Sequence, residues 1–348
     1  MSGWKRLMAG RTQIDFVGRR KRWYTISGVA IAVSVLALAL FGLNLGLEFR
    51  GGVAVQTENP AGADVAAITD ALAEIGQQNA VIQLVNDGEA VRIETPPLDQ
   101  DGQDDLRRVV AEVTGSQRED LSVEAVEPRF GALLARQAVI ALTVFLGAVA
   151  LFITWRLEWK MALAGLAALA HDIIITTGVY AITRFEVTSA TVVALLTILG
   201  YSLYDTVVVF DKVTEAAELA DKSETYPDVV NRSMNQVLVR SLNTSLTSLL
   251  PVGSLLFVGS LLLGAASLQD FALALFVGIA TGTYSSIFVA APLLAEWKKD
   301  AEVGRRKPRE DRAKTEGYTP RLQTAGPRRP PSGGSQRNRP PRPPRSGR

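Results

Sequence analysis

The sequence contains no cysteine and a single histidine, His171. Without cysteine the chain can form neither a disulfide nor a thiolate metal site, and it has no cysteine nucleophile. One histidine also excludes a metal site built from several histidines of this chain. The sequence shows no nucleophile motif, phosphate-binding loop or metal-ligand spacing. These absences argue against an enzyme and predict that the protein binds no cofactor.

Apolar residues make up an ordinary 47% of the chain, but they are concentrated in long runs. A run of about 20 apolar residues can cross a bilayer as a helix. The run at 26–43 follows a basic segment, 1–22, and an aromatic pair, so we place the first membrane helix at 23–43. A cleaved signal peptide is the alternative, but the run is long for one and no clear small-residue cleavage site follows. Five further spans are predicted at 132–154, 161–182, 188–210, 237–257 and 268–294.

Lysine and arginine are unevenly distributed among the short segments that join these spans. They are frequent before the first span and in the segments after the second, fourth and sixth, and they are rare in the other loops. Because basic residues near membrane helices remain in the cytoplasm, we predict that both termini are cytoplasmic. The segment between the first two spans then lies outside.

That segment, 44–131, reads as a small water-soluble domain in which acidic residues outnumber basic ones. Strand patterns at 53–57, 81–85, 91–94 and 121–126 alternate with helical patterns at 64–75 and 104–113. Asp87-Gly88 predicts a hairpin turn, and Gly51-Gly52 predicts a turn or a close backbone approach. The order βαββαβ predicts a ferredoxin-like α+β domain, a fold that supports many functions.

The C-terminal tail, 296–348, is rich in proline, arginine, glycine and serine. Such a composition cannot bury a core, so we predict a disordered cytoplasmic tail. Contact with anionic lipid is the simplest role for its positive charge. Contact with the ribosome or another acidic partner is the alternative, whereas specific nucleic-acid binding is not expected because no aromatic residues interleave the arginines.

The fourth predicted span contains a carboxylate, Asp205. A charge at the centre of a membrane helix costs roughly 2.5–3.5 kcal/mol, so such a residue normally faces a partner or a water path. Tyr201, Ser202 and Thr197 precede it at helical spacing on the same face. Asp211 follows six residues later, and we interpret it as marking the cytoplasmic end of this helix. Asp205 is therefore the first candidate for a proton or ion site.

The fifth predicted span has a polar stripe at helical spacing that starts at Arg240. Hydroxyls and amides on one helix face can bond to neighbouring helices or line a wet path. Arg240 and Asp205 lie at comparable depth in their spans, so a pair between them is feasible, and snorkelling of Arg240 to the interface is the alternative. Pro251, together with Gly253, frees backbone groups and permits a break of the helix there. The stripe consists of Arg240, Asn243, Thr244, Thr247, Ser248 and Pro251.

The third and sixth predicted spans carry further polar or small residues. His171 and Asp172 lie near the middle of the third span. Such a step commonly orders helix packing, but a direct role for Asp172 in a polar network around Asp205 stays open. In the sixth span Gly278 and Gly282 form a GxxxG motif, which predicts close helix packing.

Several of these segments resemble the SecF family of protein-export subunits. The most specific are GYSLYDTVVVFDKVTE at 200–215 and NQVLVRSLNTSLTSLLPV at 235–252, which are similar to the family's fourth-helix and fifth-helix motifs. LEFRGG at 47–52, HDIIITTG at 171–178 and IDFVGRRKRWYTISG at 14–28 are similar to three others, in the family's order. The resemblance covers about 14–294. Arg50 and the long tail depart from the family's pattern.

The resemblance implies six helices of the RND-like type and an extracytoplasmic domain, in a bacterial cytoplasmic membrane. It implies a SecD-like partner that completes a pseudo-symmetric heterodimer, contact with the SecYEG channel and a YajC-like small subunit, and unfolded preproteins as the cargo. It also implies use of the proton-motive force, with Asp205 and Arg240 as the proton-relay residues and protons in place of a cofactor. Asp172, Ser202, Tyr201, Asn243, Thr244 and Thr247 are candidates for a secondary polar network.

Two other functions remain open from the sequence. The chain could be half of an RND-type exporter of small molecules or lipids, although such pumps carry much larger domains after their first helix. It could also be a scaffold for the channel that carries no protons, which would not require Asp205 to titrate.

Overall fold

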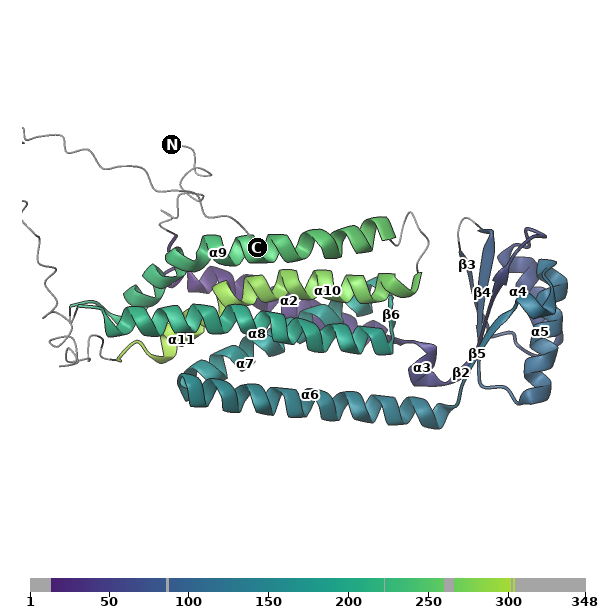
Figure 1. The fold of residues 1–348 in the computed structure, drawn as a ribbon, viewed down its shortest axis with the longest axis horizontal. Helices are drawn as coiled ribbons and strands as arrows, with labels where there is room; N and C mark the ends of the chain where they lie inside the picture. The colour runs from purple at the N-terminus through teal and green to yellow at the C-terminus, as the bar shows by residue number, and fades with distance from the viewer. Residues whose placement is uncertain (1–13, 86–87, 222, 260–265, 302, 304–348) are drawn as a thin grey trace, which may run out of the picture. The chain divides into compact units, whose positions relative to one another are not determined.

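The structure is a computed structural model that describes residues 14–85, 88–221, 223–259, 266–301 and 303. Among these residues, six helices are long and apolar enough to cross a membrane. The predicted tail beyond residue 303 and the turn residue Asp87 lie outside the described part. The helices form a bundle, and the small sheet lies between the first and second of them in sequence (Figure 1). The predicted fold class is confirmed.

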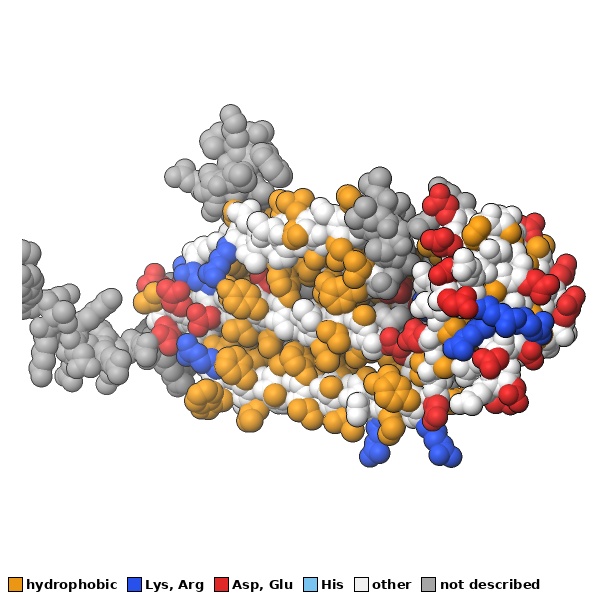
Figure 2. Space-filling view, turned by 45° about the vertical axis from the view of Figure 1, so that its right-hand side comes forward, with side chains coloured by type: hydrophobic (Ala, Val, Ile, Leu, Met, Phe, Trp, Pro, Cys, Tyr) orange, Lys and Arg blue, Asp and Glu red, His pale blue; other side chains and the backbone are white. Residues whose placement is uncertain are grey.

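The membrane helices are α2 (Arg20–Phe41), α6 (Pro128–Arg156), α7 (Trp159–Thr183), α8 (Ser189–Glu218) and α9 (Tyr226–Ser254), followed by α10 (Ala266–Ser285) and α11 (Ala291–Trp297). A π-helical turn, Ser286–Ala290, joins α10 to α11, so these two form one span. Figure 2 shows apolar side chains gathered over the bundle and charged side chains gathered towards its two ends. This distribution is what a membrane-spanning bundle requires.

One expectation about a helix end was wrong. Asp211 does not mark the end of its helix, because α8 continues to Glu218. The extension is rich in good helix formers, is supported by the Lys212–Glu215 ion pair at 2.9 Å, and buries Val213. At Pro251, where the sequence permits a break, α9 runs through the proline to Ser254 and then changes to a π-helical segment, Leu255–Gly259.

The centre of the bundle is a close contact between α8 and α10. Gly278 faces Ile198 so closely that a Cβ at Gly278 would overlap that side chain. A Cβ at Gly282 would come within 2.9 Å of the Ser202 Cβ. The role in helix packing that was predicted for this GxxxG pair is confirmed. It brings the backbone of α10 against the polar face of α8.

The small domain contains β2 (Gly52–Glu58), α4 (Val65–Glu74), β3 (Val81–Val85), β4 (Ala90–Thr95), α5 (Gln100–Thr114), a 3-10 turn (Arg118–Asp120) and β5 (Ser122–Val126). The strand order is β3-β4-β2-β5, and neighbouring strands are antiparallel, as in a ferredoxin-like fold. One face of the sheet carries Val53, Val55, Val91 and Ile93, which pack with apolar residues of α4 and α5. Figure 1 shows both helices on that face.

A connection that the sequence did not predict joins the domain to the bundle. Strand β1 (Asn44–Leu45) pairs in parallel with β6 (Glu186–Val187), and the short helix α3 (Leu47–Arg50) follows. Arg50 stabilises this connection by donating hydrogen bonds to the Leu45 carbonyl and the Asn44 side chain. Gly51 has a φ of 74°, and a Cβ there would come within 2.7 Å of the Pro128 backbone. The expected close approach at the glycine pair is therefore confirmed.

The end of the basic N-terminal segment is packed against α9. Asn235 accepts a hydrogen bond from the Ile14 backbone N–H and donates to the Ile14 carbonyl, both at 2.8 Å. Asn231 accepts from the Phe16 N–H at 2.7 Å, and the Phe16 ring is fully buried against Phe288. This contact could not be predicted from the sequence, because it depends on backbone groups of a segment outside any regular element.

Candidate functional site

Asp205 lies on the buried face of α8, and its side chain is 8% exposed. The Ser241 hydroxyl on α9 lies 2.7 Å from one carboxylate oxygen and 2.6 Å from the other. Ser286, on the π-helical turn, lies near this carboxylate, although its own hydroxyl donates to the Gly282 carbonyl at 2.7 Å. The candidate carboxylate is therefore enclosed by three helical segments. It is held by a neutral donor, which can serve both its charged and its protonated form.

Arg240 lies next to this site but does not pair with Asp205. Among the described residues no ion pair within 4 Å involves the Arg240 guanidinium, although its charge acts on Asp205 electrostatically. The direct pair that the sequence suggested is not formed, because successive residues of a helix point about 100° apart. Ser241 faces α8, so Arg240 points elsewhere. It lines a groove of about 590 Å³ together with Asp211 and Arg156.

The polar stripe of α9 does not face the rest of the chain. Arg240, Asn243 and Thr247 are exposed. Thr244, Thr247 and Ser248 donate their hydroxyls to carbonyls of the same helix. The predicted stripe thus makes no polar side-chain contact to another described helix. An exposed polar face within a membrane span is costly unless protein or water covers it.

The buried polar face of α9 is a different one. It carries Ser233, Ser241 and Ser245, each less than 5% exposed. Ser245 accepts a 2.6 Å hydrogen bond from Thr283 on α10. Sequence reasoning missed these serines, although the spacing of Ser241 and Ser245 is a signal for a small-residue helix contact.

Asp172 forms a second polar centre on α7 and is 1% exposed. Its Oδ2 accepts hydrogen bonds from Ser202 at 2.7 Å and from Ser285 at 2.9 Å. Its Oδ1 lies 3.0 Å from Nδ1 of His171, which is itself 3% exposed. The structure thus brings Asp172 and Ser202 together, as the predicted secondary network requires, and adds Ser285.

The two carboxylates share neighbours on both α8 and α10. Ser202, which bonds to Asp172, lies three residues before Asp205 on α8, just under one helical turn. Ser285 bonds to Asp172, and the adjacent Ser286 lies near Asp205. Serine hydroxyls of α8 and α10 therefore lie in the region of both carboxylates, and we call Ser202, Ser285 and Ser286 the hydroxyl layer. Ser286 also contacts Thr206 at 3.0 Å within this layer.

The other two residues that were grouped with Asp205 lie outside this layer. The Tyr201 hydroxyl is buried and has no hydrogen-bond partner among the described residues. Thr197 is exposed and donates to the Val193 carbonyl of its own helix. Neither residue contacts Asp205.

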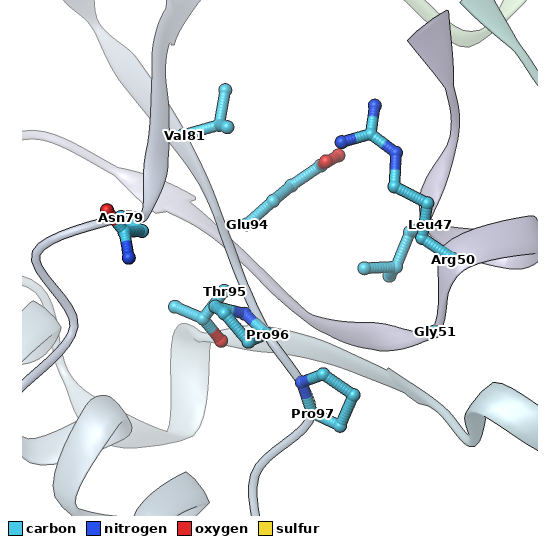
Figure 3. A pocket seen from close by; sticks show the side chains of 9 residues that line it. All are labelled: Leu47, Arg50, Gly51, Asn79, Val81, Glu94, Thr95, Pro96 and Pro97. Carbon is cyan, nitrogen blue, oxygen red and sulfur yellow. The ribbon is translucent and has the colours of Figure 1, made fainter.

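Two cavities border the outer domain, and their lining residues indicate a chemical function less clearly than the site around Asp205 does. One of about 280 Å³ lies beside the glycine pair, and Figure 3 shows the Arg50 and Glu94 side chains pointing toward one another across it. It is lined by Leu47, Arg50, Gly51, Asn79, Val81, Glu94, Thr95, Pro96 and Pro97. A second, of about 440 Å³, is lined in part by Glu186, Asp270 and Arg92. Neither cavity gathers the residue types of a known catalytic site.

Comparison with known proteins finds two sequence profiles in the chain. Residues 106–300 match the profile described as protein export membrane protein SecD/SecF, C-terminal. Residues 36–58 match the SecD/SecF GG motif. The second match contains Gly51 and Gly52, the pair at the join between the domain and the bundle.

Individual relatives agree with these profiles. The chain is 43% identical to the protein translocase subunit SecF of Streptomyces coelicolor, over 84% of this chain and 79% of that protein. It is 34% identical to the subunit SecF of Haemophilus influenzae, over 79% and 83%. The crystal structure of SecDF, a translocon-associated membrane protein from Thermus, matches with a TM-score of 0.74 and 36% identity. That match covers 83% of this chain but only 39% of the longer SecDF chain.

Proposed function

Because the chain belongs to the SecD/SecF family of protein-export membrane proteins, we propose that it is the SecF subunit of a Sec protein-export machinery. In this proposal it works with a SecD partner and uses the proton-motive force to promote the passage of preproteins through the SecYEG channel. The observation that carries the proton step is Asp205, a buried carboxylate that accepts from a hydroxyl donor inside the membrane-spanning helices. Protons are the coupling ion, and no cofactor takes part.

The mechanism follows from the two charge states of Asp205. When the carboxyl is protonated, it is neutral and keeps its hydrogen bond to Ser241. When it loses the proton, its negative charge attracts the Arg240 guanidinium, which lies in the neighbouring groove. Each proton that crosses the membrane provides about 2.3 kcal/mol per 100 mV. Movement of α8 against α9 can then be passed to the outer domain through α2 and α6, which flank it in the chain.

The exposed polar stripe of α9 supports a SecD-like partner. Arg240, Asn243 and Thr247 find no partner side chain in the described part of this chain, and a second membrane subunit would cover them. A longer relative is named SecDF, and the present chain spans 39% of its length. The proposed assembly is therefore a heterodimer, with a YajC-like small subunit as a further component and anionic lipid against the basic tail.

The charge distribution supports a bacterial cytoplasmic membrane location with both termini in the cytoplasm. Basic side chains lie at or near helix ends: Arg20 begins α2, Arg156 ends α6, Lys212 lies in the last two turns of α8, and Lys298 follows α11. The outer domain, between α2 and α6, is then extracytoplasmic. An RND-type exporter half is less well supported, because the whole connection between α2 and α6 holds one small ferredoxin-like domain.

The decisive experiment is the Asp205→Asn substitution, which keeps the size of the side chain and removes the titratable group. We expect the variant to co-purify with the SecD partner and the channel but to lose the stimulation of preprotein export by the proton-motive force. Export would be measured in inverted vesicles with and without an uncoupler. The matched control is Thr197→Val, on the exposed face of the same helix. Normal stimulated export in Asp205→Asn would refute the proton role and favour a scaffold.

A further inference from the structure

The strongest unexplained group in the bundle is the imidazole of His171. Its side chain is 3% exposed, and Nε2 has no hydrogen-bond partner among the described residues. A buried polar atom without a partner is costly and calls for a reason. The ring is not loosely placed: Nδ1 lies 3.0 Å from Asp172, and the ring stacks on Tyr284 with centroids 5.9 Å apart. Tyr284 is fixed in turn by donating to the Trp23 carbonyl at 3.1 Å and by a 3.2 Å contact with Ser27.

The hydrogen bonds of Asp172 determine where this pair can take up a proton. Oδ2 already accepts from two serines, so the labile proton between the residues lies on the line from Oδ1 to Nδ1. If the pair carries one negative charge, that proton is shared along this line and Nε2 is bare. If the pair is neutral, Nε2 carries a proton, whether the shared proton lies on Nδ1 or on Oδ1. The two charge states therefore differ by one proton at Nε2.

Both charge states have support in the same structure. Burial at 1% exposure favours the neutral pair, because a lone charge is poorly solvated there. Donation from Ser202 and Ser285 favours the carboxylate. A site with opposing influences of this kind can exchange a proton without a change of fold.

We propose that His171 and Asp172 form a second proton-binding site, in series with Asp205, in which Nε2 of His171 takes up the proton. The inference rests on the proposed function. In the transfer, protonated Asp205 gives up one proton and becomes a carboxylate, and the negatively charged pair gains one proton at Nε2 and becomes neutral. The total charge of the two sites does not change. Ser202 and Ser285 of the hydroxyl layer bond to Asp172, and Ser286 contacts Thr206, the residue that follows Asp205.

The groups that surround this site are mostly neutral. Tyr284 on α10 is the titratable side chain in direct ring contact with His171. The helices that pack against α7 also carry Tyr24 (α2), Tyr201 and Asp205 (α8), Asp270 (α10), Arg156 (α6) and Glu296 (α11). Of these, Asp205 is linked to the pair through neighbouring serines, so its charge should be felt most strongly at His171.

The single histidine of the chain makes a direct measurement feasible. The full chain, labelled with ¹⁵N on its imidazoles and purified with its partners on a tag that contains no histidine, would be reconstituted in lipid. Subtraction of the spectrum of the His171→Asn complex isolates His171, and His171→Gln provides the same subtraction if the asparagine variant does not assemble. We expect Nε2 to change from unprotonated to protonated as the pH is lowered. We also expect the midpoint to differ in Asp205→Asn and in Asp172→Asn.

An export assay separates a proton role from a positioning role. His171→Asn retains a short amide that can donate to Asp172, but it has no atom at the Nε2 position. A positioning role predicts wild-type stimulation of export in this variant, whereas the proposal predicts loss of the stimulated component. The control is Thr197→Val. Constant protonation of Nε2 over the whole pH range, or full stimulation in His171→Asn, would overturn the inference. If these tests overturn the inference but Asp205→Asn still loses the stimulated export, the proposed function remains supported.

Discussion

The two carboxylates inside the bundle are enclosed in different ways. Asp172 is 1% exposed and accepts from donors on two other helical segments, in addition to its contact with His171. Asp205 is 8% exposed, is bonded by Ser241, and has Arg240 close by in a groove of about 590 Å³. One carboxylate is enclosed by its partners, and the other lies near a groove.

In the proposed mechanism the two sites have different roles. The groove is lined by Arg240, which is next to Ser241, the partner of Asp205, so Asp205 is the site that a proton from the groove would reach first. A carboxylate at such an entrance needs a partner that can respond to its charge. The deeper site needs a fixed geometry, which its serines and the stacked ring of His171 provide.

The largest expected effect on this comparison comes from Arg240→Met. The substitution keeps an unbranched side chain and removes the only basic group that acts electrostatically on Asp205 in the described structure. We expect loss of most of the export stimulated by the proton-motive force, because the carboxylate of Asp205 would have no charge to attract. Arg156→Met, on the opposite side of the same groove, is the matched control. Wild-type export in Arg240→Met would show that Arg240 only extends to the interface.

A smaller effect is expected when single serines are removed. Ser285→Ala takes one of two hydroxyl donors from the buried Asp172, and hydrogen bonds to charged groups contribute about 1.5–3 kcal/mol. Ser241→Ala takes the donor that contacts both oxygens of Asp205. We expect Ser285→Ala to lower the thermal stability of the purified complex more. We expect Ser241→Ala to change the pH profile of stimulated export more. The opposite ranking would reverse the roles that we assign to the two sites.

Much of the architecture could be predicted because a membrane imposes simple rules on sequence. The spans are visible as apolar runs, the outer domain as alternating patterns, and Asp205 as a carboxylate where lipid is expected. The contact at Gly278 was also visible, since small residues four apart permit close helix approach. In each case one residue's own chemistry, or a local spacing, was enough.

The orientation of α9 could not be predicted in the same way. The helix has two polar faces, one with Arg240 and Asn243 and one with Ser241 and Ser245. The charged face seemed the better partner for Asp205, yet close packing against α8 and α10 selects the smaller side chains. Which face turns inward depends on the shape of the neighbouring helices. The pairing of β1 with β6 depends likewise on contacts between segments about 140 residues apart.

The smallest expected effect tests whether burial alone makes a carboxylate a working proton site. Glu186 lies outside the spans, and burial, followed by the nearby charge of Glu94, raises the pKa of its carboxyl above the ordinary 4.5. The folded protein then keeps a proton that the unfolded chain has already released, so stability falls as the pH rises through the window above 4.5. Glu186→Gln should remove this dependence and raise the melting temperature at neutral pH by about 2 °C at most.

Export should be unchanged in Glu186→Gln, since no hydrogen bond of the described residues links Glu186 to the hydroxyl layer of the bundle. Glu58→Gln, at an exposed position of β2, is the control for the loss of one charge. A loss of stimulated export in Glu186→Gln would mean that the proton path extends to the outer ends of the helices, and that the two sites compared here are only its inner part.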